Sequence, residues 1–281
     1  MYETLDIHVD APVATVWMNR PAVHNAFNAT FIRELTAACN VLDADTSLRV
    51  IVLAGRGKSF SAGGDLNWMR ETADADSLSN HDDARRLATM LRTLSEISKP
   101  TIARVHGAAL GGGMGLVSAC DICIASSTAS FATSEVRLGL IPAAISPYVI
   151  RAIGQRQAYR YFQTAERLSA ERAAQLGLVH EVVAPEHLDS KVQEIVDALL
   201  LGGPSAQSAA KDLIRNVAEQ RVDDTVLEDT ARRIAVLRSQ PEAKEGMTAF
   251  LDRREPEWVA RIAKAPSVSM SAGSSNEVTD S

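Results

Sequence analysis

Hydrophobic positions in the first third of the chain follow two different periods. The segments "LDIHV" and "VATVWMN" alternate with a period of two, which predicts two strands joined by a turn at "APV". Residues 29 to 43 place Phe31, Leu35 and Leu42 on one stripe and predict a helix. The continuous apolar run "LRVIVLAG" predicts a strand that is buried on both faces.

The same alternation of strand and helix continues to about residue 190. Residues 71 to 81 are polar and aperiodic and predict a surface loop, and residues 82 to 98 predict a helix that Pro100 ends. The strands "TIARV" and "ICIAS" enclose a glycine cluster and a short helix, so we expect an α/β fold with a parallel sheet covered by helices. Farther on, "SAERAAQLG" predicts a helix that Ser169 caps and Gly177 closes.

Beyond that point the pattern is almost entirely helical. We predict an α/β core over residues 1–190 and a helical region over residues 191–264. The small, polar residues 265–281 have no pattern and predict a disordered tail.

Composition narrows the classes of function. The 281 residues are 46% hydrophobic, which suits a large core, and a net charge of −6 disfavours nucleic acid as a partner. The start carries Glu3, Asp6 and Asp10 instead of a basic leader, and no run of 18 apolar residues follows. We expect a cytoplasmic protein without a membrane partner.

Three cysteines make neither a disulfide framework nor a metal site. Cys39, Cys120 and Cys123 are too few for a framework, which fits a reducing compartment. Cys120 and Cys123 form a CxxC, but residues three apart on a strand point to opposite faces. No second CxxC or HxxxH completes a metal site, so we expect no metal and two small core residues.

Two glycine-rich loops each follow an apolar strand. The segment "GAALGGGMGL" holds five of the chain's sixteen glycines within nine residues, and "FSAGGDL" is the other loop. Leu116 breaks the dinucleotide pattern GxGxxG, and "GRGKS" lacks the spacing of a P-loop. Bare backbone N–H groups also stabilise oxyanions, such as the enolate of a thioester.

Five segments in order resemble the crotonase (enoyl-CoA hydratase/isomerase) superfamily to about residue 260: "FSAGGDL", "VHGAALGGGMGL", "CDICIAS", "SEVRLGLIP" and "AERLSAERAAQLGLVHEVV". The resemblance implies a crotonase-type spiral of ββα units with a helical C-terminal trimerisation region. It also implies a homotrimer, or a hexamer built as a dimer of trimers, and an acyl-CoA substrate. Coenzyme A is then part of the substrate, and no separate cofactor is expected.

The resemblance assigns residues as well. Gly64 and Gly112 match the backbone donors of the oxyanion hole. The segments "RPAVHNA" and "SAGGD" match those that hold coenzyme A, which makes the expected substrate-binding residues Val23, Ala62, Gly63, Asp65 and Leu66. Asp65 is expected to open the following helix.

Hydratases of this superfamily commonly use two glutamates, and only one is present here. Glu135 matches the second, whereas the first falls on Gly115. A single carboxyl group with its pKa raised by burial could still give and take a proton at the substrate. Single-glutamate members include enoyl-CoA isomerases.

The segments "RPAVHNAFNATFIREL" and "SEVRLGLIPAAISPYVIRAIG" are similar to bacterial 3-methylglutaconyl-CoA hydratases, which also lack the first glutamate. We therefore expect hydration of a β-branched glutaconyl-CoA, giving 3-hydroxy-3-methylglutaryl-CoA in leucine catabolism. The alternatives are isohexenylglutaconyl-CoA hydration in acyclic terpene degradation, isomerisation, and acyl-CoA binding without turnover.

Several further residues keep two interpretations. Ser146 either holds water or the distal carboxylate, or caps the helix that Pro147 starts. Trp68 and Met69 either line the acyl pocket or pack within the protein. Cations near the motifs are Arg70, Arg104 and Arg137, and none is assigned to the distal carboxylate.

Overall fold

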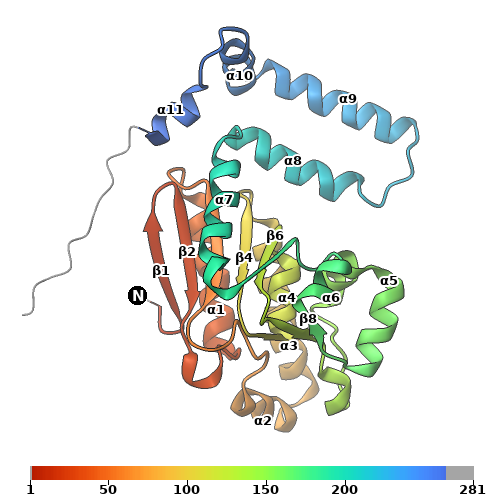
Figure 1. The fold of residues 1–281 in the computed structure, drawn as a ribbon. Coiled ribbons are helices and arrows are strands. Elements are labelled where there is room, and N and C mark those ends of the chain that lie inside the picture. Colours follow the sequence, from red (N-terminus) through yellow and green to blue (C-terminus); the bar gives the residue numbers. More distant parts are fainter. Residues whose placement is uncertain (1, 264–281) are drawn as a thin grey trace, which may run out of the picture.

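The strands form two sheets in the computed structural model, which describes residues 2–263 (Figure 1). The larger sheet has the order β1-β2-β3-β4-β6-β9, in which β1 and β2 are antiparallel and the other neighbours are parallel. Its strands are β1 (Leu5–Asp10), β2 (Val13–Met18), β3 (Val50–Gly55), β4 (Thr101–Val105), β6 (Ile122–Ser126) and β9 (Glu181–Val183). The smaller sheet joins β5 (Ala108–Leu110), β7 (Ser130–Ala132) and β8 (Leu168–Ser169).

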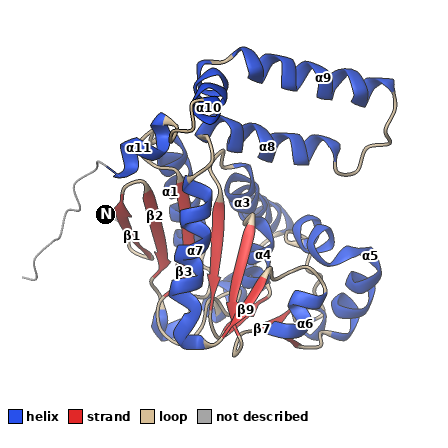
Figure 2. Cartoon of the chain, turned by 45° about the horizontal axis from the view of Figure 1, so that its top comes forward, coloured by secondary structure: helices blue, strands red, loops and turns tan. Residues whose placement is uncertain are grey.

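Helices lie against both faces of the larger sheet (Figure 2). In chain order, the helices before β9 are η1 (Pro21–Val23), α1 (Ala29–Ala44), α2 (Leu66–Asp74), α3 (Ser77–Glu96), α4 (Gly112–Ala119), η2 (Glu135–Leu138), α5 (Ser146–Thr164) and α6 (Ala170–Gln175). The helices after β9 are η3 (Pro185–His187), α7 (Leu188–Leu200), α8 (Pro204–Val217), α9 (Asp224–Ser239), α10 (Pro241–Leu251) and α11 (Glu257–Ala263).

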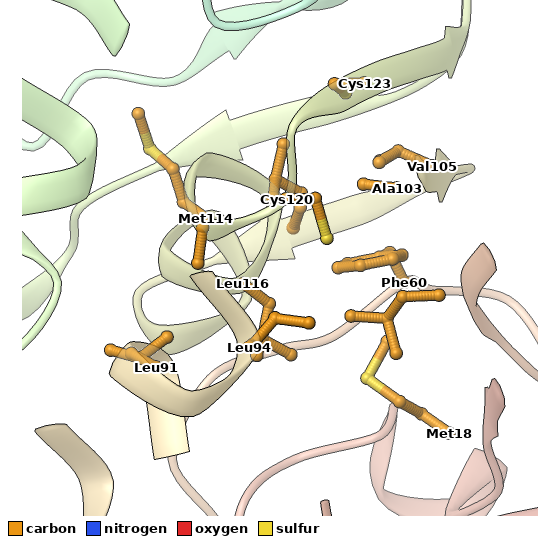
Figure 3. Packing of buried hydrophobic residues seen from close by; sticks show 14 of the residues in the cluster. Met18, Phe60, Leu91, Leu94, Ala103, Val105, Met114, Leu116, Cys120 and Cys123 are labelled. Carbon is orange, nitrogen blue, oxygen red and sulfur yellow. The ribbon is translucent and has the colours of Figure 1, made fainter. Parts of the chain in front are cut away.

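Strand β3 is buried on both faces, as its apolar run predicts. Ile51 and Leu53 belong to the main cluster that α1, α3 and α4 form with the sheet, whereas Val50 and Val52 pack with residues of α7 on the opposite face. Figure 3 shows the main cluster, where Leu91 and Leu94 of α3 lie near Leu116 of α4. The two-sided burial fixes β3 in the middle of the fold, and the chain that leaves it carries one of the glycine loops.

Local signals placed several elements correctly. The predicted helix over residues 29 to 43 is α1, and Asn28 caps it by accepting a hydrogen bond from Phe31 N at 2.8 Å. Ser169 caps α6 in the same way, with 3.2 Å to Arg172 N, and Gly177 follows that helix with a φ of +88°. The turn at "APV" joins the antiparallel strands β1 and β2.

The prediction of a loop over residues 71 to 81 is wrong. These residues form the end of α2, a short break and the start of α3. The side chain of Asp76 accepts a hydrogen bond from Ser79 N at 2.8 Å, which caps α3 before its apolar stripe begins. Because this part of both helices is exposed or half-buried, it carries no hydrophobic period.

Cys120 and Cys123 are both buried, which confirms their interpretation as core residues. Cys120 ends α4 instead of lying on a strand, and Cys123 lies on β6. Burial raises the pKa of both thiols, so both are protonated at neutral pH. Within residues 2–263, no group of three histidine, cysteine or acidic side chains is arranged to hold a metal ion.

The helical C-terminal part does not begin at residue 191. That boundary falls inside α7, whose Leu188, Val192 and Val196 pack on the larger sheet. Helices α8 and α9 extend beyond the body of the protein (Figure 1), and α8 is tied to it by Lys211, which donates to Asp121 at 2.7 Å. The predicted disordered tail lies outside the described residues. None of the helices in residues 2–263 has the length and apolar character needed to cross a bilayer.

The buried position of α4 predicts a large cost for truncating its core side chains. Leu116→Ala should lower the free energy of unfolding by about 2–5 kcal/mol, because a fully buried side chain leaves a cavity. The matched control is Val41→Ala on α1, which is 62% exposed and should change stability by about 0.5 kcal/mol or less. Urea unfolding measures both variants, and equal effects would contradict this description of the core.

Candidate active site

The first glycine loop is held by backbone hydrogen bonds to the segment that follows η1. Phe27 N donates to Gly63 O at 2.6 Å, and Asp65 N donates to Phe27 O at 2.8 Å. In a trans peptide the C=O and N–H point in opposite directions, so the N–H of Gly64 points away from Phe27. Within the described part of the chain, Gly64 N has no hydrogen-bond acceptor. This loop therefore presents a free donor.

The second glycine loop presents another donor at the start of α4. Gly111 has a φ of +50° and donates from its N–H to Ala132 O at 2.8 Å, while its carbonyl accepts from Gly115 N. By the same peptide geometry, the N–H of Gly112 points outward from the N-terminus of α4. No acceptor for Gly112 N occurs among residues 2–263. The helix dipole adds partial positive charge at this end.

The two donor loops are in contact, and their glycines make this contact possible. A β-carbon added at Gly63 would lie 2.9 Å from Leu110 O and 3.5 Å from Gly112 N. A β-carbon added at Gly112 would lie 2.5 Å from the ring of Phe27. Side chains at either position would push the loops apart. The structure thus brings the predicted donors Gly64 and Gly112 into one site.

Glu135 lies directly beside these donors. It starts η2, just after β7, and its Oε1 would be 3.1 Å from a β-carbon added at Gly111. The same added atom would be 4.0 Å from Gly63 Cα. The Oε2 atom of Glu135 is buried and has no hydrogen-bond partner in the described structure. Burial raises the pKa of this carboxyl group, and its own backbone N–H offsets this only in part.

The place of the missing glutamate is filled by apolar packing. A β-carbon added at Gly115 would lie 2.3 Å from Ile145 Cγ2 and 3.7 Å from Leu91 Cδ2. Gly115 N donates to Gly111 O at 3.1 Å, so Ile145 packs on α4 one turn beyond the residue that Glu135 approaches. The site consequently has a carboxyl group at Gly111 and a hydrocarbon wall at Gly115.

The aromatic and thioether side chains of α2 lie against the first donor loop. A β-carbon added at Gly64 would be 2.7 Å from Met69 Cε and 3.4 Å from Trp68 Cζ3. Trp68 also packs against the main hydrophobic cluster, which supports the packing interpretation, and its place in the acyl pocket stays a prediction. Sequence reasoning missed Phe27, whose ring covers Gly112. An aromatic residue directly before Asn28, the N-cap of α1, was the feature of the sequence that could have indicated it.

The other predicted substrate-binding residues occupy different settings. Val23 in η1 is 41% exposed and Leu66 at the start of α2 is 71% exposed. Asp65 is buried, caps α2 through Asn67 N at 2.8 Å and pairs with Arg20 at 2.9 Å. Its predicted role in opening the helix is confirmed, and the geometry leaves this carboxylate as an anchor. The Ala62 N–H donates to His24 O at 2.9 Å.

Ser146 is not the N-cap of α5. The helix begins at Ser146 itself and Ile145 is the N-cap, because the Ser146 hydroxyl donates to Ala143 O at 2.8 Å in the preceding turn. Arg104 pairs with Asp189, and Arg137 is exposed without an ion-pair partner among the described residues.

Comparison with known proteins assigns this arrangement to a family. The sequence profile described as "Enoyl-CoA hydratase/isomerase" matches residues 8–261. The chain belongs to the enoyl-CoA hydratase/isomerase family. Its α/β architecture is accordingly the crotonase fold, with a helical C-terminal region.

Individual relatives match along almost their whole length. The chain is 41% identical to a crystal structure of an enoyl-CoA hydratase from Shewanella pealeana, with a TM-score of 0.89 over 92% of this chain and 97% of that one. It is 35% identical to a probable enoyl-CoA hydratase from Rhizobium meliloti over 92% of this chain and 99% of the relative. It is 30% identical to the 2,3-dehydroadipyl-CoA hydratase of Escherichia coli over 89% of this chain and 96% of the relative.

The burial of Glu135 predicts how stability depends on pH. A carboxyl group whose pKa is raised in the folded state binds more protons there than in the unfolded state. The stability that this group contributes is therefore lost as the pH rises from its unfolded-state pKa through its folded-state pKa. Glu135→Gln should therefore be more stable than the natural protein at pH 8, and the difference should shrink at pH 4. Urea unfolding at both values measures it, and a variant that is less stable at pH 8 would refute the assignment.

Proposed function

We propose that this chain adds water to the α,β double bond of a β-branched glutaconyl-CoA. The reaction would convert 3-methylglutaconyl-CoA to 3-hydroxy-3-methylglutaryl-CoA, a step of leucine catabolism in the cytoplasm. The observation that carries the proposal is the half-buried Glu135, whose Oε2 is buried without a hydrogen-bond partner in the described structure, beside the free N–H groups of Gly64 and Gly112. Addition of water is redox-neutral, so the reaction needs no cofactor beyond the coenzyme A of the substrate.

Each group has a role that its geometry allows. The thioester oxygen accepts hydrogen bonds from Gly64 and Gly112, which stabilise the negative charge of the enolate. Glu135 takes a proton from water as the water oxygen bonds to the β carbon, and a proton is then returned to the α carbon. A β branch helps that carbon bear positive charge, which reduces the activation that water needs. The hydrocarbon wall at Ile145 fits a mechanism with one carboxyl group.

The dicarboxylic character of the substrate rests on resemblance. The E. coli relative is named for 2,3-dehydroadipyl-CoA, a thioester of a dicarboxylic acid. The motifs quoted above resemble methylglutaconyl-CoA hydratases, and isohexenylglutaconyl-CoA is the longer alternative. A turnover panel of the two thioesters decides between them.

Isomerisation is the second candidate, because one carboxyl group suffices to move a proton between the α and γ carbons. The apolar packing at Gly115 leaves no room for a second carboxyl group, which suits this reaction as well as the proposed hydration. Turnover in oxygen-18 water separates the two reactions. Hydration incorporates the label into a tertiary alcohol, and isomerisation of a 3-enoyl thioester incorporates none.

Glu135→Gln should lower kcat by about 100- to 10,000-fold, the usual contribution of a general acid–base group. Dehydration of 3-hydroxy-3-methylglutaryl-CoA is the assay, and the circular dichroism spectrum checks the fold. The matched control is Glu34→Gln. The Glu34 carboxylate accepts hydrogen bonds from Thr4 and from the backbone of Glu3, and it contacts neither donor loop in these bonds. Unchanged activity in Glu135→Gln would end the mechanism. Tight binding of both thioesters without any turnover by the natural protein would instead indicate a binding protein.

We further propose that the chain assembles as a homotrimer or as a dimer of trimers. Helix α10 exposes large apolar side chains, with Phe250 at 82% and Leu251 at 77% exposed. Exposed apolar surface of this kind is typical of an interface between subunits.

Phe250→Asp should convert the assembly to smaller species, because a buried charge opposes association. Sedimentation velocity measures the mass. Val41→Asp places the same charge at a 62% exposed position on α1 and should leave the assembly intact. A natural protein that sediments as a monomer would contradict the proposal.

A further inference from the structure

Ser61 lies between the two donor loops and is fully buried. Its backbone runs parallel to β5, because Ser61 N donates to Ala108 O at 3.0 Å and Ser61 O accepts from Leu110 N at 2.9 Å. Strand β5 leads directly into Gly111 and α4. The backbone of Ser61 thus joins the first loop to the chain that carries the second donor.

The hydroxyl of Ser61 makes two further bonds, one to the segment that follows η1 and one within the first loop. It donates to Asn25 O at 2.9 Å and accepts from Gly63 N at 3.3 Å. Asn25 is also fully buried, and its side chain accepts from Arg20 N and donates to Ser59 O, both at 2.9 Å. The carbonyl to which the hydroxyl donates is therefore held in place from both sides.

The side chain of Ser61 also contacts the first turn of α4. A β-carbon added at Gly113 would lie 2.6 Å from Ser61 O and 3.0 Å from Ser61 Cβ. Ser61 consequently touches the residue before one donor and the residue after the other.

We propose that the Ser61 hydroxyl is a positioning residue that sets the direction of the Gly64 N–H relative to the Gly112 N–H. The inference rests on the proposed use of these two donors for the thioester oxygen. Gly63 has a φ of +89° and is bound at its carbonyl by Phe27 and at its N–H by Ser61. The Phe27 bond holds the Gly63–Gly64 peptide, which carries the Gly64 N–H, and the Ser61 bond holds the preceding Ala62–Gly63 peptide. Together they fix the two dihedral angles of Gly63 between these planes, since glycine has little conformational preference of its own.

Removing the hydroxyl should reduce turnover more than substrate binding. In Ser61→Ala the Gly63 N–H loses its acceptor, and the donor moves away from the position where charge develops. We expect kcat to fall by about 10- to 100-fold, as for a small misplacement of a catalytic group, with KM changed by less than about threefold.

Ser61→Cys separates hydrogen bonding from packing. A thiol fills the space of the hydroxyl but is a weak donor and acceptor. If the hydroxyl positions the donor, kcat stays low in Ser61→Cys. If Ser61 only fills space, Ser61→Cys recovers natural activity, and the inference is overturned. Ser126→Ala is the matched control, because it also removes a buried hydroxyl. Ser126 ends β6, and its hydroxyl is hydrogen-bonded to that of Thr128 at 2.9 Å.

A spectroscopic readout keeps this test independent of the reaction type. An unreactive enoyl-CoA whose double bond is conjugated to an aromatic ring absorbs at longer wavelength when donors polarise its carbonyl. The natural protein and Ser126→Ala should produce the same red shift on binding, and both Ser61 variants a smaller one. A full red shift in Ser61→Ala refutes the positioning role even if the natural protein proves to be an isomerase. Absence of hydration with a normal red shift in the natural protein refutes only the proposed hydratase function.

Discussion

The site depends on backbone pairing between three segments that are distant in sequence. Phe27 pairs with Gly63 and Asp65, and Ser61 pairs with β5. Each pairing uses a carbonyl on one side of a peptide and leaves the next N–H directed to the other side. The free N–H of Gly64 is therefore a consequence of the pairing with Phe27, and the free N–H of Gly112 is a consequence of the first turn of α4, where Gly111 O accepts from Gly115 N. Backbone pairing holds both loops, and the Ser61 hydroxyl adds a side-chain bond by accepting from Gly63 N at 3.3 Å.

Glycines in the two loops solve separate packing problems. Gly112 admits the ring of Phe27 and Gly113 admits the backbone of Ser61, so both are needed for close approach. Gly115 differs, because it accommodates the side chain of Ile145 at the position of the missing glutamate. Glu135 is the carboxyl group that remains, and burial raises its pKa.

The sequence predicted the parts whose signals are local. Periodicity placed α1 and β3, and the resemblance of five ordered motifs to the crotonase superfamily predicted that Glu135, Gly64 and Gly112 share one site. It failed for residues 71 to 81, where Asp65 and Asp76 cap helices whose exposed surface lacks an apolar stripe. Of the two interpretations left open for Ser146, the N-cap of α5 is wrong by one residue, and the Ser146 hydroxyl bonds within the preceding turn. The contact of Ile145 with Gly115 joins residues 30 apart, and no local pattern encodes it.

The site separates two carboxyl groups by their environments. Burial acts to raise the pKa of Asp65, but the Asn67 N–H and the Arg20 guanidinium outweigh it, and the pKa lies below its ordinary value. Asp65 therefore stays ionised and holds α2, with Trp68 and Met69, beside Gly64. Glu135 has no such partner within the described residues, so burial dominates and its pKa rises. Over the pH range between these two pKa values, Asp65 keeps its charge while Glu135, the proposed proton-exchanging group, changes its own, so α2 stays anchored beside Gly64.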